Sequence, residues 1–216
     1  MAKMTPMMRQ YLDMKDQYPG MILFFRLGDF YEMFFEDAKL VSRELELTLT
    51  GKSCGMEERA PMCGVPFHSA ETYINRLIEK GYKVAICEQM KDPATTKGLV
   101  RRDVVRVVTP GTVIEQSMLE DRRNSYLLSV CLDGNRAGIA FADVSTGEFS
   151  VYEIDKASVR LQDELARIAP KEIIANAQLP EGATTLPFSV ENSVGFQFVK
   201  AKNALLDHFK VQALDA

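Results

Sequence analysis

The chain has 216 residues, a formal net charge of −4 and a hydrophobic content of 46%. This length suits one large domain or two small ones, each with a core of its own. The negative charge argues against a protein that coats nucleic acid through bulk positive charge. No apolar run approaches the ~20 residues that a transmembrane helix needs. Lys and Arg balance Asp and Glu in residues 1–115, so contacts with nucleic acid are expected from local basic groups there.

The spacing of the cysteines and the sequence of residues 1–6 bear on the cellular compartment of the protein. Cys54, Cys63, Cys87 and Cys131 show neither close pairing nor the spacing of metal ligands. Free thiols are therefore favoured over zinc ligands or disulfides. Residues 1–6 lack the apolar core of a signal peptide. We predict a cytoplasmic protein without a membrane span.

The first half of the chain alternates helical and strand patterns. Thr5-Pro6 predicts a helix start, with threonine as the N-cap and proline at the first helical position. The apolar run 21–25 predicts a buried strand, and residues 34–45 have apolar side chains at helical spacing. Further strands are predicted at 48–50, 83–89 and 104–108, a helix at 69–80, and loops at 51–60 and 92–98. The loop 51–60 is expected to be poorly ordered without a ligand.

A polar connector at 116–124 precedes a second set of elements. Three strand patterns separated by hairpin turn signals are followed by a helix and another strand. They cover residues 126–132, 137–144, 148–154, 159–168 and 172–175. An antiparallel meander followed by a helix and a strand is typical of a ribonuclease H-like sheet. We predict an α/β protein with domains at 1–115 and 125–216, the second of them truncated at its end.

Two candidate phosphate-binding features lie in the first domain. Gly51-Lys52-Ser53 is a poor phosphate loop, because Glu46 stands where the motif needs a glycine. A local basic run comprises Lys97, Arg101, Arg102 and Arg106. It is either a solvated loop face or a set of phosphate contacts, which Arg26 and Lys52 would join.

An alternative function rests on Asp143 in the second domain. In a ribonuclease H-like sheet, an aspartate on an early strand can hold one metal of a two-metal nuclease site, with Glu148 and Glu153 as companions. The chemistry requires several carboxylates to converge on the metals. An aspartate before a hairpin turn is also common for reasons of turn geometry alone.

The segment Gly28-Asp29-Phe30-Tyr31-Glu32 follows the first predicted strand directly. Phe30 and Phe34 are at i and i+4, so both can belong to the core face of one helix. Gly28-Asp29 instead permits a sharp turn, which would place Phe30 at the exposed junction of a strand and a helix. An exposed aromatic there can wedge between stacked bases, at a cost of a few kcal/mol per unstacked step.

These five residues resemble the Phe-x-Glu signature of the MutS family of DNA mismatch-recognition proteins. The resemblance continues in the family's order at residues 5–12, 61–68, 84–89, 92–98 and 104–112. More loosely, the remainder resembles the start of the family's connector domain. The resemblance implies a mixed-sheet α/β mismatch-recognition domain at 1–115, followed by the ribonuclease H-like connector domain.

The resemblance also implies roles for particular residues. Phe30 would stack on a mispaired base from the minor groove of a kinked duplex, and Glu32 would form a hydrogen bond to that base. Gly28 would give the turn its backbone freedom, with Asp29 and Tyr31 as turn and core residues. Arg26, Lys52 and Arg102 are the predicted phosphate contacts. The implied function is recognition of mismatched or unpaired bases in duplex DNA to initiate mismatch repair.

The resemblance further implies which activities lie outside this chain. The family's ATPase, and with it ATP and Mg²⁺, belongs to other domains, so we expect no catalysis, cofactor or metal here. The expected partners are mismatched double-stranded DNA, a second MutS subunit, and MutL through the connector domain. The expected location is the cytoplasm, in association with the nucleoid.

Overall fold

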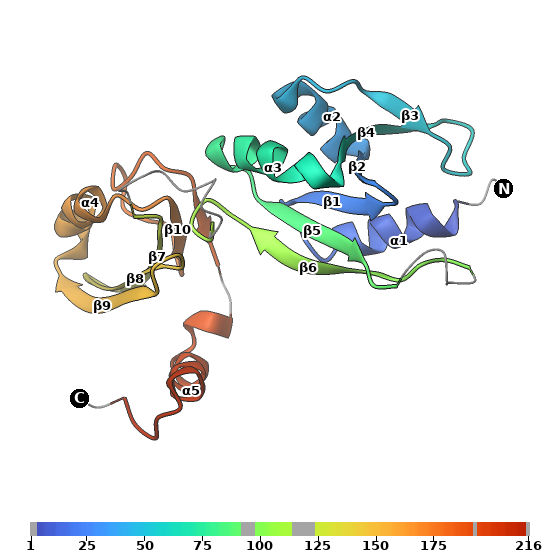
Figure 1. The fold of residues 1–216 in the computed structure, drawn as a ribbon. Helices are drawn as coiled ribbons and strands as arrows, with labels where there is room; N and C mark the ends of the chain where they lie inside the picture. Colours follow the sequence, from blue (N-terminus) through green and yellow to red (C-terminus); the bar gives the residue numbers. More distant parts are fainter. Residues whose placement is uncertain (1–3, 92–97, 114–123, 192–193, 215–216) are drawn as a thin grey trace. The chain divides into compact units, whose positions relative to one another are not determined.

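The computed structural model describes residues 4–91, 98–113, 124–191 and 194–214. The chain divides into two units, Met1–Pro110 and Gly111–Ala216, each with its own sheet (Figure 1). Within the described ranges, every helix is too short or too polar to cross a membrane. The predicted α/β class, with two mixed sheets, is confirmed.

The first unit is a six-stranded mixed sheet with helices on both faces. Its elements are α1 (Pro6–Lys15), β1 (Ile22–Leu27), β2 (Phe30–Phe34), α2 (Phe35–Leu45), β3 (Thr50–Lys52), β4 (Ala60–Pro66), η1 (Phe67–Ser69), α3 (Ala70–Glu79), β5 (Val84–Gln89) and β6 (Arg102–Val108). The strand order is β3-β4-β2-β1-β5-β6. Strands β1 and β5 are parallel, and the other neighbours are antiparallel.

Helix α1 and the pair α2 and α3 cover opposite faces of this sheet (Figure 1). Tyr11 of α1 packs edge-on against Phe25 and Phe34, with ring centroids 5.4 and 4.9 Å away. On the other face, the thiol of Cys63 donates to the carbonyl of Ala38 in α2. Because side chains alternate between the faces of a strand, these contacts assign one face to each set of helices.

A buried carboxylate fastens α1, β1 and α2 together. Asp37 lies in the first turn of α2 and accepts hydrogen bonds from the Tyr11 hydroxyl (3.2 Å), the Lys15 ammonium (2.7 Å) and the Leu23 amide (2.9 Å). Burial, and next the charge of Asp37, raise the pKa of Tyr11. The hydroxyl therefore stays protonated and remains a donor to the carboxylate.

The predicted elements of the first unit are largely confirmed, including the Thr5 cap, whose Oγ1 accepts from the Met8 amide. Four predictions differ from the structure. The chain enters a second strand, β2, before the helix α2 begins. The strand predicted at 48–50 lies at 50–52, so the predicted loop 51–60 contains the ends of β3 and β4. Strand β6 begins at Arg102 rather than at 104, and β4 has no counterpart among the predictions.

The second unit is a five-stranded sheet in the order β11-β10-β7-β8-β9. Its elements are β7 (Tyr126–Asp133), β8 (Arg136–Asp143), β9 (Glu148–Asp155), α4 (Ala157–Ile168), β10 (Glu172–Ala175), β11 (Phe188–Val190), η4 (Val194–Phe196) and α5 (Phe198–Phe209). Strands β7 to β9 form an antiparallel meander, and β10 returns parallel to β7. This is the predicted arrangement, to which the structure adds β11 and α5.

The first unit ends at Pro110 and the second begins at Gly111. Gly111 belongs to the second unit, because its amide donates to the Glu172 carboxylate at 3.2 Å. A Cβ atom at position 111 would lie 3.0 Å from the Cβ atoms of Leu127 and Glu172, so glycine permits this close approach. Almost all of the predicted linker 116–124 lies outside the described residues, and the linker stays a prediction.

Candidate functional site

Phe30 stands at the tip of a β-hairpin, not at the entrance of a helix. Residues 28 and 29 form a two-residue turn, after which Phe30 pairs with Leu27 of β1. Gly28 has a φ of +59°, in the left-handed region, which suits the first central position of such a turn. The amide of Phe67 donates to the Asp29 carbonyl at 2.9 Å and holds the turn. The hairpin therefore presents Phe30, 47% exposed, on a backbone fixed on both sides.

On one face of β2, the side chains become more exposed from Phe34 towards Phe30. Phe30, Glu32 and Phe34 point to the same face of the strand. Phe34 is fully buried under Tyr11 of α1, Glu32 is half-buried, and Phe30 is exposed. Tyr31 points to the opposite face and donates its hydroxyl to Glu88. The face of Phe30 and Glu32 is thus the uncovered end of the surface on which α1 packs.

Lys52 is the cation that the structure pairs with Glu32. It ends the short edge strand β3, and its ammonium lies 2.5 Å from the Glu32 carboxylate. The prediction of Lys52 as a loop residue is therefore wrong, since its backbone pairs with that of Ala60 in β4. Its side chain is 33% exposed, against 15% for that of Glu32. A role of Lys52 in contacting phosphate stays a prediction.

Arg26 contacts the hairpin turn and the ring of Phe67. Its guanidinium lies 3.6 Å from the centroid of the Phe67 ring, and its Nε donates to the Gly28 carbonyl. A second contact is an ion pair of 3.8 Å with Glu88, which also accepts from the Tyr31 hydroxyl. These contacts assign Arg26 a part in holding the turn, and they do not support the predicted phosphate contact.

Arg102 is directed into the first unit. Its Nε donates to the Arg26 carbonyl at 2.7 Å, and its Nη1 donates to Gln10 and to the Val100 carbonyl at 3.0 Å. Burial lowers the pKa of Arg102. The side chain is buried and its donors face internal oxygens, so the structure gives no support to its predicted contact with phosphate.

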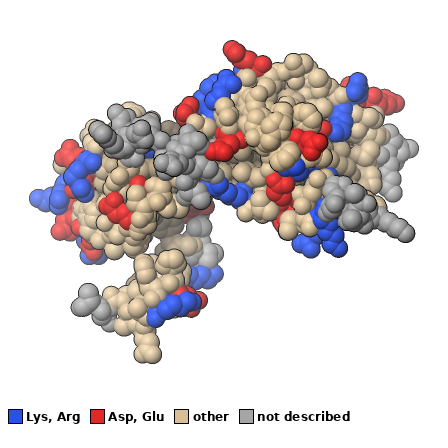
Figure 2. Space-filling model, viewed as in Figure 1, with Lys and Arg blue, Asp and Glu red and all other residues tan. Residues whose placement is uncertain are grey.

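Of the remaining basic residues in the predicted run, Arg106 lies on β6. Arg101 is exposed and pairs with Asp103, whereas Lys97 lies outside the described residues. On the face drawn in Figure 2, positive and negative side chains are interspersed over the first unit. On this face, local groups rather than a basic surface would have to supply the electrostatic part of any contact with nucleic acid.

Asp143 has the environment of a turn residue. It ends β8, and its carboxylate accepts from the amides of Ser125, Ser145 and Thr146 and from the Ser145 hydroxyl. Burial alone would raise the pKa of Asp143, but these hydrogen bonds, led by that of the Ser145 hydroxyl, lower it. Glu153 lies five positions beyond Glu148 on β9, roughly 16 Å along the strand. In the described part of the chain, no three acidic, His or Cys side chains gather as metal ligands.

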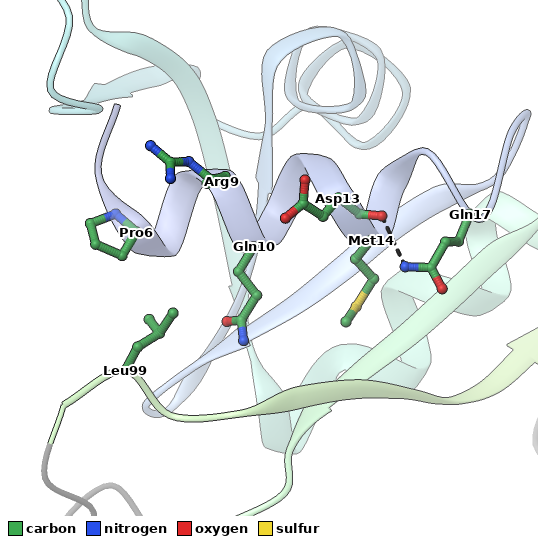
Figure 3. A pocket seen from close by; sticks show the side chains of 7 residues that line it. All are labelled: Pro6, Arg9, Gln10, Asp13, Met14, Gln17 and Leu99. Carbon is green, nitrogen blue, oxygen red and sulfur yellow. Dashed lines mark hydrogen bonds between the residues drawn. The ribbon is translucent and has the colours of Figure 1, made fainter. Parts of the chain in front are cut away.

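A groove along α1 borders Arg102, because Gln10 in its lining accepts a hydrogen bond from Nη1 of Arg102. Figure 3 shows its lining, which consists of Pro6, Arg9, Gln10, Asp13, Met14, Gln17 and Leu99. None of the sequence-predicted site residues belongs to it.

Gly28→Ala is expected to lower the free energy of unfolding by about 1 kcal/mol, because an L side chain is strained in the left-handed region. No atom lies within 4 Å of the place that a Cβ atom would take there, so steric overlap adds nothing. Gly138→Ala is the matched control, because its Cβ would meet the Cβ of Cys131 only at ordinary contact distance, 3.9 Å. Urea unfolding measures both, and equal losses would contradict a role for the backbone conformation of Gly28.

Comparisons with known proteins cover nearly the whole chain. Residues 5–117 match MutS domain I, and residues 125–216 match MutS domain II. The DNA mismatch repair protein MutS of Ruminiclostridium cellulolyticum is 52% identical over 100% of this chain and 26% of its own length. Those of Acetivibrio thermocellus and Clostridioides difficile are 61% and 59% identical over 82% of this chain, and over 21% and 18% of their own lengths.

The chain thus spans about a quarter or less of the length of these curated relatives. Its two structural units correspond to the two matched domains, with the change of unit at residue 110 and the change of matched domain between 117 and 125. Since two successive domains match in order and the identities exceed 50%, the chain belongs to the MutS family.

Proposed function

We propose that this chain recognises mismatched or unpaired bases in duplex DNA and so initiates mismatch repair. The observation that carries the proposal is Phe30, an aromatic side chain 47% exposed at the tip of a rigid hairpin, with a carboxylate on the same face. Three similar relatives are named as DNA mismatch repair proteins, which supports the same conclusion.

The hairpin can act as a wedge in the minor groove. An inserted apolar side chain unstacks one base step and kinks the duplex, at a cost of a few kcal/mol. The cost is lowest for bases that are mispaired or unpaired, because these have lost part of their pairing energy. Phe30 would therefore sense how easily a step deforms rather than which bases form it.

Glu32 supplies the second part of the discrimination. A carboxylate near phosphates and stacked bases adds repulsion and desolvation cost to every complex. A displaced base that offers a hydrogen-bond partner offsets this cost, whereas a well-paired duplex offers none at that position. The carboxylate thus acts against matched DNA more than against mismatched DNA.

The wider activity of the family is proposed for the complete protein rather than for these two domains. We place ATP hydrolysis outside this chain, together with its Mg²⁺. The second unit would serve as the connector that contacts MutL. A second MutS subunit would supply further contacts to the DNA. The nuclease alternative gains no support, since both carboxylate oxygens of Asp143 accept hydrogen bonds within the unit.

The proposal is tested with two duplexes of one sequence, one matched and one with a single central mismatch. Fluorescence anisotropy of the full protein at several salt concentrations gives the two affinities. We expect a preference for the mismatch of at least about tenfold, since unstacking a matched step costs a few kcal/mol. Equal affinities for both duplexes would refute the proposal.

A further inference from the structure

We propose that Lys52 sets the mismatch specificity of this protein by holding Glu32, and that it exchanges this carboxylate for a DNA phosphate on binding. The inference rests on the proposed function of the hairpin and adds to it a residue that acts through Glu32. Lys52 is thus a positioning residue and not merely one more basic contact.

The geometry that brings the two side chains together is specific. Glu32 lies on β2 beside Gly64 of β4, and Lys52 lies on β3, the next strand outward. A Cβ atom at position 64 would lie 3.5 Å from Cγ of Glu32 and 3.3 Å from the Tyr31 carbonyl oxygen. Glycine therefore leaves the space through which the Glu32 side chain extends. The Lys52 ammonium lies 5.8 Å from the centroid of the Phe34 ring, on the same face.

The pair has the properties of an exchangeable contact. The Glu32 side chain is enclosed, with 15% exposed, while that of Lys52 is 33% exposed. A lysine has a compact charge on a flexible stem, so its ammonium can move while its backbone stays in the sheet. The carboxylate next to Phe30 is thus neutralised by a cation that can also reach an incoming phosphate.

A duplex would compete with Glu32 for this cation. If the ammonium moves to a phosphate, the carboxylate loses its counter-charge beside the bases, which is costly in an enclosed site. A displaced base can then donate a hydrogen bond to the Glu32 carboxylate, whereas a matched duplex leaves the carboxylate without a partner. With matched DNA, Lys52 either stays with Glu32 and gives up the phosphate, or binds the phosphate and leaves Glu32 without a partner. With mismatched DNA, Lys52 binds the phosphate while Glu32 binds the displaced base.

The test is a double-mutant cycle on the full protein with matched and single-mismatch duplexes. The variants are Lys52→Met, Glu32→Gln and the double variant, with Lys52→Arg as the conservative replacement. We expect Lys52→Met to lower the ratio of the two affinities about fivefold, the size of a coupling between neighbouring residues. In the Glu32→Gln background the same change should lower both affinities equally and leave the ratio unaltered. Lys52→Arg should retain most of the ratio.

A matched control removes one positive charge elsewhere on the first unit. Lys39 pairs with Glu36 on the surface of α2, so Lys39→Met should leave the ratio unchanged. Equal losses for both duplexes in Lys52→Met, additive with Glu32→Gln, would overturn the inference and leave Lys52 as a phosphate contact. Absence of any mismatch preference in the unaltered protein would instead refute the proposed function, so the two failures are distinguishable.

Discussion

Phe30→Ala is expected to abolish the preference for mismatched over matched duplex while leaving the fold intact. Stacking of one base on an aromatic side chain contributes about 1–3 kcal/mol by alanine substitution, so the affinity for a mismatch should fall roughly 30-fold. The affinity for matched DNA should change little, because the cost of unstacking a matched step offsets most of the binding free energy that insertion of Phe30 contributes. Since the ring is 47% exposed, its removal takes few contacts from the core.

The measurement is the ratio of the two affinities, accompanied by a melting curve of each variant. Phe149→Ala is the matched control, because Phe149 is also 47% exposed and also lies on a strand, β9 of the second unit. It should leave the ratio unchanged. A preserved mismatch preference in Phe30→Ala, with a normal melting curve, would show that another group inserts into the duplex.

The meander of the second unit was predictable from the sequence because each of its strands pairs with the next strand along the chain. Strands β7, β8 and β9 are joined by short turns at Gly134 and Gly147, both with positive φ, and each strand follows directly on the last. Polar and apolar residues alternate where one face is covered by α4. Strand β11 has only three residues, too few for a clear pattern, and α5 carries apolar residues such as Phe198, Leu205 and Phe209 at helical spacing but buries none of them.

The hairpin of the first unit illustrates a different limit. Phe30–Phe34 has apolar side chains on both faces, since the sheet is covered on both sides, and so it lacks the alternation of a half-exposed strand. The spacing of Phe30 and Phe34 fits a helix equally well. Pairing with β1 across the two-residue turn at Gly28, together with pairing with β4, selects the strand.

The candidate site was predictable where it depends on neighbours in sequence and not where it depends on packing. Phe30, Glu32 and the turn at Gly28 lie within five residues, so their association follows from the chain itself. The contact of Lys52 with Glu32 requires the order β3-β4-β2. The inward direction of Arg102 follows from the register of β6, which shifts between Ile86 and Cys87 of β5. Neither arrangement leaves a local signal in the sequence.

Asp37→Ala is expected to destabilise the first unit by about 3 kcal/mol, because it leaves a largely buried ammonium without its partner. The same change removes one of the two acceptors of the Tyr11 hydroxyl, the other being the Phe34 carbonyl, and it removes the acceptor of the Leu23 amide. Leu23 lies beyond the part of β1 that pairs with β2, so Asp37 supplies the acceptor that a strand would otherwise provide. Such a loss is a large fraction of the ~5–15 kcal/mol that stabilises a typical domain.

Urea unfolding and hydrogen exchange at the Leu23 amide measure the global and the local effect. Asp37→Asn keeps an acceptor for Tyr11 and Leu23 but loses the charge facing Lys15, so its loss should be smaller. Glu36→Ala is the control, because the Glu36 carboxylate is exposed on the surface of α2. Its removal should change the free energy of unfolding by about 0.5 kcal/mol or less. If Asp37→Ala matched Glu36→Ala, the buried carboxylate would not be what fastens α1 over the sheet. The position of α1 decides which end of the β2 face stays open, so the exposure of Phe30 and Glu32 depends on a contact seven residues beyond the hairpin tip.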